Sequence, residues 1–170
     1  MNKIINIAVV GLGQIGIYLL NELNKKKKEI ELKTGKKINI VAISAKNKNK
    51  KRKFKVDKKI FFSNPLNIFK EKKVDILFEA VGLSDGISKK IVEKALQNKI
   101  HVITPNKALI AKHGDYLASL AEKNNVNLEF EASVAGGIPI LRTIKEGLAT
   151  NQIKKVYGIL NGTTNYILSE

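Results

Sequence analysis

Three glycines near the start of the chain have the spacing that binds a phosphate group. Gly11, Gly13 and Gly16 form G-x-G-x-x-G within GLGQIG, which follows an apolar run directly and opens a segment with helical periodicity. In this pattern the first glycine permits a tight turn, the second lets the backbone approach a pyrophosphate, and the third allows the helix to pack closely on the strand. The anion then lies at the positive end of the helix. The sequence predicts a dinucleotide site, the alternative being a glycine-rich turn without a ligand.

The residue that ends the second predicted strand bears on which dinucleotide binds. An NAD site places Asp or Glu there, about 20 residues past the glycines, to bond the ribose 2′-hydroxyl. Here the insertion KKKKEIELKTGKK moves that point to Ser44 and Ala45, neither of which is acidic, and Lys46 and Lys48 follow. A missing carboxylate and nearby ammonium groups favour NADP(H) over NAD(H), although lysine is common enough here for Lys46 to be incidental.

A lysine outside the lysine-rich region follows the fourth predicted strand. Thr104, Pro105, Asn106 and Lys107 come just past its carboxyl end, where ligands of open parallel sheets bind. Lys107 could donate a proton or provide a cationic contact to cofactor or substrate. The alternative is an exposed lysine at the start of a helix, and spacing alone does not separate the two.

Composition limits the class of protein. The chain has 170 residues, 44% of them hydrophobic, no Cys and only 2 His, which excludes disulfide frameworks, thiolate zinc sites and thiol nucleophiles. No apolar run is long enough to span a bilayer, and the N-terminus lacks the features of a signal peptide. We therefore expect a cytoplasmic protein that does not bind membranes.

The net charge of +16 is concentrated in one region. Residues 25–73 hold 19 of the 31 basic side chains, and the remainder of the chain is close to neutral. This region could be an anion site or a nucleic-acid surface. A coding bias toward A and T, which enriches Lys, Asn and Ile, is the favoured explanation for most of these lysines.

The elements that must position these residues alternate along the chain. Apolar runs predict strands at 4–10, 38–44, 74–82, 101–104 and 126–132, and helical spacing recurs after the glycines and over 86–98 and 106–124. Segment 46–63 reads as a long solvated loop. The residues expected to return the chain to the core are Phe61, Phe62, Leu66, Ile68 and Phe69. This order predicts an α/β fold with a Rossmann-like, doubly wound parallel sheet.

The pattern changes after residue 132. GGIPILRTIKEGLA predicts a helix, residues 153–160 a strand, NGTTN a turn and YILSE the start of another helix. We expect a nucleotide-binding domain over 1–132 and, from 133 to 170, the incomplete beginning of an α+β catalytic and dimerisation domain.

Four ordered motifs carry a family resemblance. GLGQIG, TPNKALIAKHG at 104–114, FEASVAGGIPILR at 130–142 and GILNGTTNYIL at 158–168 resemble homoserine dehydrogenase over nearly the whole chain. The resemblance implies an NAD(P)-dependent oxidoreductase that interconverts L-aspartate 4-semialdehyde and L-homoserine in threonine, methionine and isoleucine biosynthesis. It also implies a homodimer for the full-length protein.

The resemblance assigns roles to individual residues. It implies that the cofactor contacts are Gly11, Gly13, Gln14, Ile15, Gly16, Lys46, which meets the 2′-phosphate, and Lys107, which is also catalytic. It implies that backbone carbonyls of Glu131, Val134, Gly136 and Ile138 bind a structural sodium ion. Asn161, Gly162 and Thr163 match a turn close to the substrate.

The resemblance implies one further expectation, and one alternative to it stays open. The family's substrate-binding acids and its second, proton-donating lysine lie beyond position 170, so the 170-residue chain alone should be inactive. The alternative function is a catalytically inactive basic Rossmann module that binds a dinucleotide or, through 46–59, nucleic acid. Phe54 is the sole aromatic residue in that stretch, which makes nucleic acid the less favoured ligand.

Overall fold

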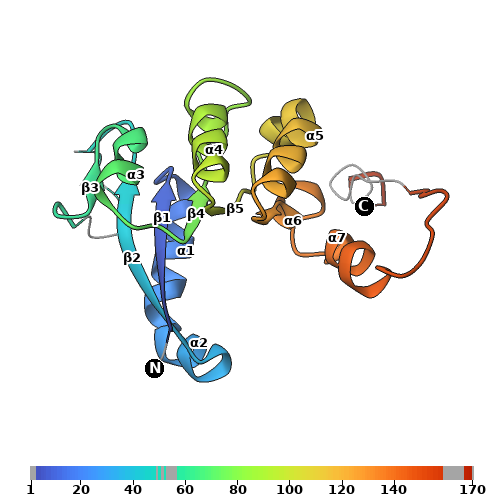
Figure 1. The fold of residues 1–170 in the computed structure, drawn as a ribbon, viewed down its shortest axis with the longest axis horizontal. Coiled ribbons are helices and arrows are strands. Elements are labelled where there is room, and N and C mark those ends of the chain that lie inside the picture. Colours follow the sequence, from blue (N-terminus) through green and yellow to red (C-terminus); the bar gives the residue numbers. More distant parts are fainter. Residues whose placement is uncertain (1–2, 49, 51, 53–56, 159–166, 170) are drawn as a thin grey trace.

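A parallel β-sheet forms the centre of the molecule in this computed structural model, which describes residues 3–48, 50, 52, 57–158 and 167–169 (Figure 1). Its strand order is β3-β2-β1-β4-β5-β6, and every neighbouring pair is parallel. The strands are β1 (Lys3–Val10), β2 (Lys36–Ser44), β3 (Phe61–Phe62), β4 (Ile76–Glu79), β5 (His101–Ile103) and β6 (Leu128–Glu129). This is the predicted doubly wound α/β architecture.

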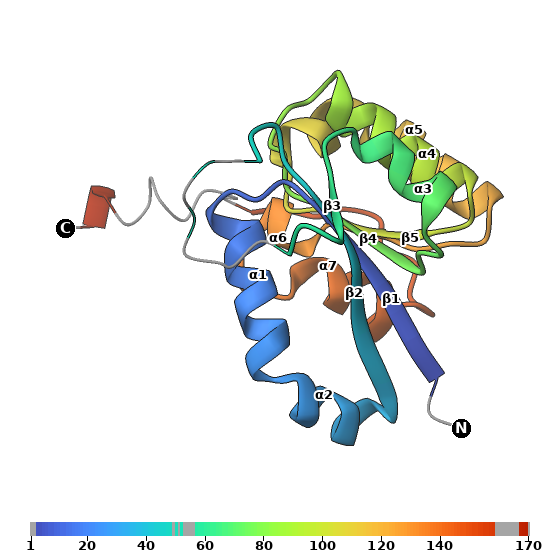
Figure 2. The ribbon, with the colours of Figure 1, turned by 90° about the vertical axis from the view of Figure 1, so that its left-hand side faces the viewer.

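Helices cover both faces of the sheet. One face carries α3 (Ile68–Glu71), α4 (Ile87–Gln97) and α5 (Lys107–Lys123), and the opposite face carries α1 (Gln14–Lys25), with α2 (Lys27–Thr34) following it (Figure 2). Because both faces are covered, the central strands are nearly continuous apolar runs, and Ala8, Val9 and Val10 are all buried. Two apolar clusters result, one on each side of the sheet.

The helix boundaries follow from local sequence. The Asn106 side-chain oxygen accepts a hydrogen bond from the Leu109 N–H at 3.1 Å, which satisfies one of the unpaired donors at the start of α5. Leu109, Leu117 and Ala121 then recur at helical spacing and are buried against the sheet. The predicted helices at 86–98 and 106–124 are confirmed as α4 and α5.

The strand ends bring the candidate residues to one edge. Val10 lies opposite Ser44 on one side and Glu79 on the other, and Phe78 lies opposite Ile103. Parallel neighbours are about 4.8 Å apart. The glycine turn after β1 and Lys107 after β5 therefore leave the same edge of the sheet, separated by the end of β4.

Helix α2 and the last strand of the sheet differ from the sequence prediction. Helix α2 was not predicted; Gly35, with φ of 65°, ends it in the left-handed conformation, and Lys33 bonds Glu29 one turn away. The predicted strand 126–132 is shorter than expected, because after β6 the chain turns into the short helix α6 (Glu131–Val134). The predicted return of the chain to the core is confirmed, since Ile68 is buried and Phe62, Leu66 and Phe69 pack against its cluster.

The segment after α6 is largely exposed. The predicted helix is present as α7 (Ile140–Arg142) and a wider turn over Thr143–Gly147, and residues 167–169 are helical as expected. The predicted strand at 153–160 is wrong over 153–158, which are exposed and adopt neither helix nor strand. A strand needs a partner edge to pair its backbone groups, and none of the described strands lies beside 153–158. Residues 159–160 and the predicted turn NGTTN lie outside the described residues.

Candidate cofactor site

The glycine turn is held by backbone contacts that explain two of its three glycines. Gly11 has φ of +102°, and its N–H donates to the Ser44 carbonyl at 2.9 Å. A Cβ at Gly11 would overlap the Ala80 carbonyl, and a Cβ at Gly16 would overlap the Gly11 carbonyl. Both positions therefore require glycine for packing between the turn, α1 and the end of β4.

Gly13 has a different environment. It precedes α1 with an extended backbone, and a Cβ built on it would meet no heavy atom within 4 Å. The space beside Gly13 is thus open at the N-terminal end of a 12-residue helix, where backbone N–H groups attract an anion. Gln14 and Ile15, in the first turn of α1, are both exposed beside it.

A hollow of about 1060 Å³ extends from this turn along the carboxyl edge of the sheet. The turn and the ends of β2 and β4 form its wall. Its lining consists of Val10, Gly11, Leu12, Gly13, Ser44, Ala45, Lys46, Asn47, Lys48, Lys50, Arg52, Ser63, Pro65, Ala80, Val81, Leu83 and Ile87. The location matches the position at which open parallel sheets bind ligands.

All the charged side chains among the described lining residues of this hollow are positive. Lys46, Lys48, Lys50 and Arg52 contribute four cationic groups, and no carboxylate occurs among the described lining residues. Lys46 is exposed, whereas the Lys48 ammonium lies 5.5 Å from the centre of the Phe61 ring. The end of β2 therefore carries cationic side chains and, among the described lining residues, no Asp or Glu that could accept a hydrogen bond from a ribose 2′-hydroxyl.

Arg52 was not identified from the sequence, and it links the basic loop to the glycine turn. Its guanidinium donates to the carbonyls of Asn47 at 2.5 Å, Lys50 at 3.0 Å and Leu12 at 3.4 Å. A planar fork of N–H donors suits such multiple carbonyl contacts better than an ammonium does. Arginine is rare in this lysine-rich chain, and this rarity is the feature of the sequence that could have identified Arg52 as a candidate site residue.

Lys107 is the first residue of α5 and is exposed at the same edge. Its ammonium forms no ion pair with any described carboxylate. The preceding residues are anchored: Thr104 and Asn106 are buried, and Asn106 caps the helix. The structure thus presents Lys107 as an exposed cation on a fixed backbone.

A buried carboxylate lies beneath this corner. Glu79 ends β4 with no exposed surface, and its oxygens accept from the Thr104 hydroxyl at 2.6 Å and the Val81 N–H at 2.8 Å. The Asn106 amide lies 3.4 Å from both oxygens and donates to the Leu83 carbonyl at 2.8 Å. Sequence reasoning missed Glu79, although an acid inside an apolar strand was the available signal.

The loop between β4 and α4 is also tied to α5 at the surface. Asp85 accepts hydrogen bonds from Ser84 at 2.7 Å and Lys112 at 2.8 Å, and His113 Nε2 lies 2.9 Å from its other oxygen. The hydrogen bond from Lys112, then those involving His113 and Ser84, hold the pKa of the Asp85 carboxyl well below its ordinary value. These contacts restrain the same loop that contributes Val81 and Leu83 to the hollow.

The residues implied for a sodium ion lie in one short segment. Glu131 and Val134 bound α6, Gly136 follows with φ of 63°, and Ile138 precedes α7. The carbonyls of Glu131 and Ile138 each accept one backbone hydrogen bond, from Ala135 and Ile140. Each oxygen keeps a second lone pair, so carbonyl ligation is chemically compatible with this segment. Asn161, Gly162 and Thr163 lie outside the described residues.

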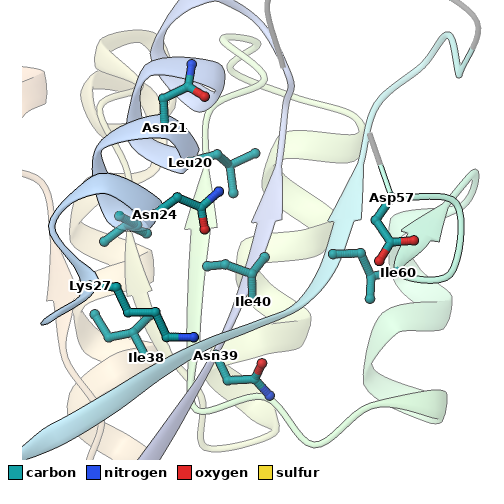
Figure 3. Close-up of a pocket in the computed structure, with 10 residues that line it drawn as sticks. Leu20, Asn21, Asn24, Lys27, Ile38, Asn39, Ile40, Asp57 and Ile60 are labelled. Carbon is teal, nitrogen blue, oxygen red and sulfur yellow. The ribbon is translucent and has the colours of Figure 1, made fainter. Parts of the chain in front are cut away.

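A second hollow, of about 500 Å³, lies away from this edge (Figure 3). It is bounded by α1, the start of α2 and the first half of β2, with Asp57 and Ile60 also in its lining. It includes neither the glycine turn nor a strand's carboxyl end. The first hollow is therefore the candidate cofactor site.

Comparison with known proteins places this geometry in a family. The family profile described as "Homoserine dehydrogenase, NAD binding domain" matches residues 11–131. The chain belongs to the homoserine dehydrogenase family. A second profile, described as "Homoserine dehydrogenase", matches residues 139–170.

Individual relatives show how much of the family's length is represented. The chain is 42% identical to homoserine dehydrogenase of Neisseria gonorrhoeae over 99% of this chain and 38% of that protein. It is 36% identical to the Bacillus subtilis homoserine dehydrogenase over 99% of this chain and 39% of that one. The chain thus spans about two fifths of the length of these curated relatives.

Solved structures agree with the fold. A homoserine dehydrogenase from Thiobacillus denitrificans superposes with a TM-score of 0.82 at 34% identity, over 98% of this chain and 38% of that one. A putative homoserine dehydrogenase from Archaeoglobus fulgidus gives a TM-score of 0.77 at 30% identity, over 97% and 54%. None of the described helices of the present chain is long and apolar enough to cross a bilayer.

Proposed function

We propose that this chain forms the cofactor-binding part of an NADP(H)-dependent homoserine dehydrogenase, which interconverts L-aspartate 4-semialdehyde and L-homoserine. The observation that carries the proposal is the hollow beside Gly13, which combines an open helix N-terminus with a basic rim. A dinucleotide pyrophosphate suits the first feature and a 2′-phosphate the second. Lys46 is the proposed contact to that phosphate.

Lys107 is the proposed catalytic residue. NADPH, when bound, supplies the hydride that reduces the aldehyde carbon. An ammonium at this edge stabilises the negative charge that develops on the substrate oxygen. Lys107 fits this role because it is an exposed cation without a described carboxylate partner, on a helix whose first turn is anchored.

The remaining roles follow the family resemblance. The carbonyls of Glu131, Val134, Gly136 and Ile138 would hold a sodium ion, and Asn161, Gly162 and Thr163 would contact the substrate. The proposed boundary between the nucleotide-binding domain and the catalytic and dimerisation domain lies between residues 132 and 133. We expect the full-length protein to form a homodimer through the catalytic and dimerisation domain. The location proposed is the cytoplasm, where amino-acid biosynthesis occurs.

Cofactor preference gives the direct test. Removing one charge-assisted phosphate contact costs about 1.5–3 kcal/mol. Lys46→Ala should therefore weaken NADPH binding about tenfold or more and leave NADH binding nearly unchanged, as measured by titration calorimetry.

Lys28→Ala provides the matched control, because Lys28 is an exposed lysine of α2 outside the lining of the hollow. It should change neither affinity. Equal losses for NADPH and NADH in Lys46→Ala would contradict the assignment of Lys46 to the 2′-phosphate.

A further inference from the structure

Glu79 is a buried acid that the cofactor contacts described above do not use. It has no exposed surface, and no Lys, Arg or His forms an ion pair with it among the described residues. An isolated acid at such a position is costly unless its oxygens are hydrogen-bonded. The groups that donate hydrogen bonds to the Glu79 oxygens come from three different segments of the chain.

Those segments meet at the carboxyl ends of β4 and β5. The Val81 N–H belongs to the loop that follows β4, the Thr104 hydroxyl ends β5, and the Asn106 amide begins α5. The cluster is also closed on itself, since the Asn106 N–H donates to the Thr104 hydroxyl oxygen at 3.1 Å. Glu79 thus fixes the β4 loop and the start of α5 relative to each other.

Both segments face the proposed cofactor site. Val81 and Leu83 line the hollow, and the Leu83 carbonyl is held by the Asn106 amide at 2.8 Å. Lys107 is the next residue after Asn106. A shift of either segment would therefore move the wall of the hollow and Lys107 together.

The order of the strands indicates which half of a dinucleotide would lie near Glu79 and Lys107. In this class of fold the ribose that carries the 2′ group would lie at the end of β2, and β4 and β5 lie on the opposite side of β1 from β2. The other half of a bound dinucleotide, with the nicotinamide, would then extend toward β4 and β5. We infer that Glu79 is a positioning residue that holds the β4 loop and Lys107 for the nicotinamide half of the cofactor.

This inference rests on the proposed function, but an experiment can contradict the role of Glu79 while supporting the binding of the cofactor. The experiment measures the affinity of the 170-residue chain for NADPH and for 2′,5′-ADP, which carries the adenosine half alone. Glu79→Gln keeps the size of the side chain and replaces one acceptor oxygen by a donor facing Thr104. We expect about a tenfold weaker affinity for NADPH and an affinity for 2′,5′-ADP within twofold of the original.

Two further variants separate positioning from general stability. Thr104→Val removes the hydroxyl that donates to Glu79 and should reproduce the selective loss, so the test holds even where Glu79→Gln does not fold. Glu129→Gln is the matched control, because Glu129 also ends a strand at this edge but is exposed. It should leave both affinities unchanged.

Each outcome distinguishes the claims. An equal loss for both ligands, or no loss for either, in folded Glu79→Gln and Thr104→Val variants would overturn the positioning role. If the unsubstituted chain binds neither NADPH nor 2′,5′-ADP, the proposed cofactor function itself is wrong.

Discussion

Val92 and Val156 are both valines in segments with regular apolar spacing, yet their side chains have opposite environments. Val92, in α4, has 0% exposed surface, whereas Val156 is 65% exposed. Helix α4 packs against the sheet and α5, but residues 153–158 pair with none of the described strands. Apolar periodicity therefore indicates burial only where the chain also supplies the opposing surface.

Amide exchange should show the largest difference between these two regions. Amides in α4 exchange only when the sheet domain opens, whereas those of 152–158, outside helix and strand, are accessible directly. We expect the Val92 amide to exchange at least about 1000-fold more slowly than the Val156 amide, given ordinary domain stability. Comparable protection at both positions, measured by NMR at low protein concentration, would show that 152–158 are paired in solution.

A matched pair of substitutions measures the same difference as stability. Val92→Ala removes two buried methyl groups and leaves a cavity, which should lower the free energy of unfolding by about 2 kcal/mol. Val156→Ala should change it by less than about 0.5 kcal/mol, as for other exposed positions. Denaturant titration gives both values, and a larger loss in Val156→Ala would invalidate the contrast.

The pairing of Asp85 with α5 should give a smaller, pH-dependent effect. Because its pKa is lowered in the folded state, chiefly by the hydrogen bond from Lys112, its contribution is present above its unfolded pKa of about 3.9 and declines as the pH falls below it. Asp85→Asn should therefore lower the denaturant midpoint at pH 5, and the difference from the original chain should shrink by pH 3.

Asp115→Asn tests whether this dependence is specific. Asp115 is an exposed acid of α5, the helix that carries Lys112 and His113, and it forms no ion pair among the described residues. Its removal should leave the midpoint nearly unchanged at both pH values. A difference between Asp85→Asn and the original chain that is constant from pH 5 to pH 3 would contradict the role of the Asp85 carboxylate.

The sheet, its faces and the glycine turn were predictable because local patterns specify them. A run such as Ile7–Val10 reads as a strand buried on both faces, and GLGQIG marks the strand-to-helix turn without any long-range information. The position of Lys107 followed from counting strands, since every parallel strand ends at the same edge.

The contacts of Arg52 and Glu79 were not predictable in the same way. Arg52 reaches the Leu12 carbonyl 40 residues away, and Glu79 meets Thr104 across 25 residues. Such contacts depend on where loops lie after folding. The strand expected at 153–160 is absent over the described residues 153–158 for a related reason, because its apolar residues identified a surface to be covered but not the element that would cover it.

Titration of the chain with NADPH, with and without Gly13→Val, tests the central claim most directly. The space beside Gly13 is open, so valine should fit the folded chain without a clash while occupying the place of the pyrophosphate. We predict that the original chain binds NADPH and that Gly13→Val, with an unchanged circular dichroism spectrum and a cooperative melting transition, loses at least about 100-fold in affinity. An unchanged NADPH affinity in the folded Gly13→Val variant would contradict the assignment of the cofactor to this turn.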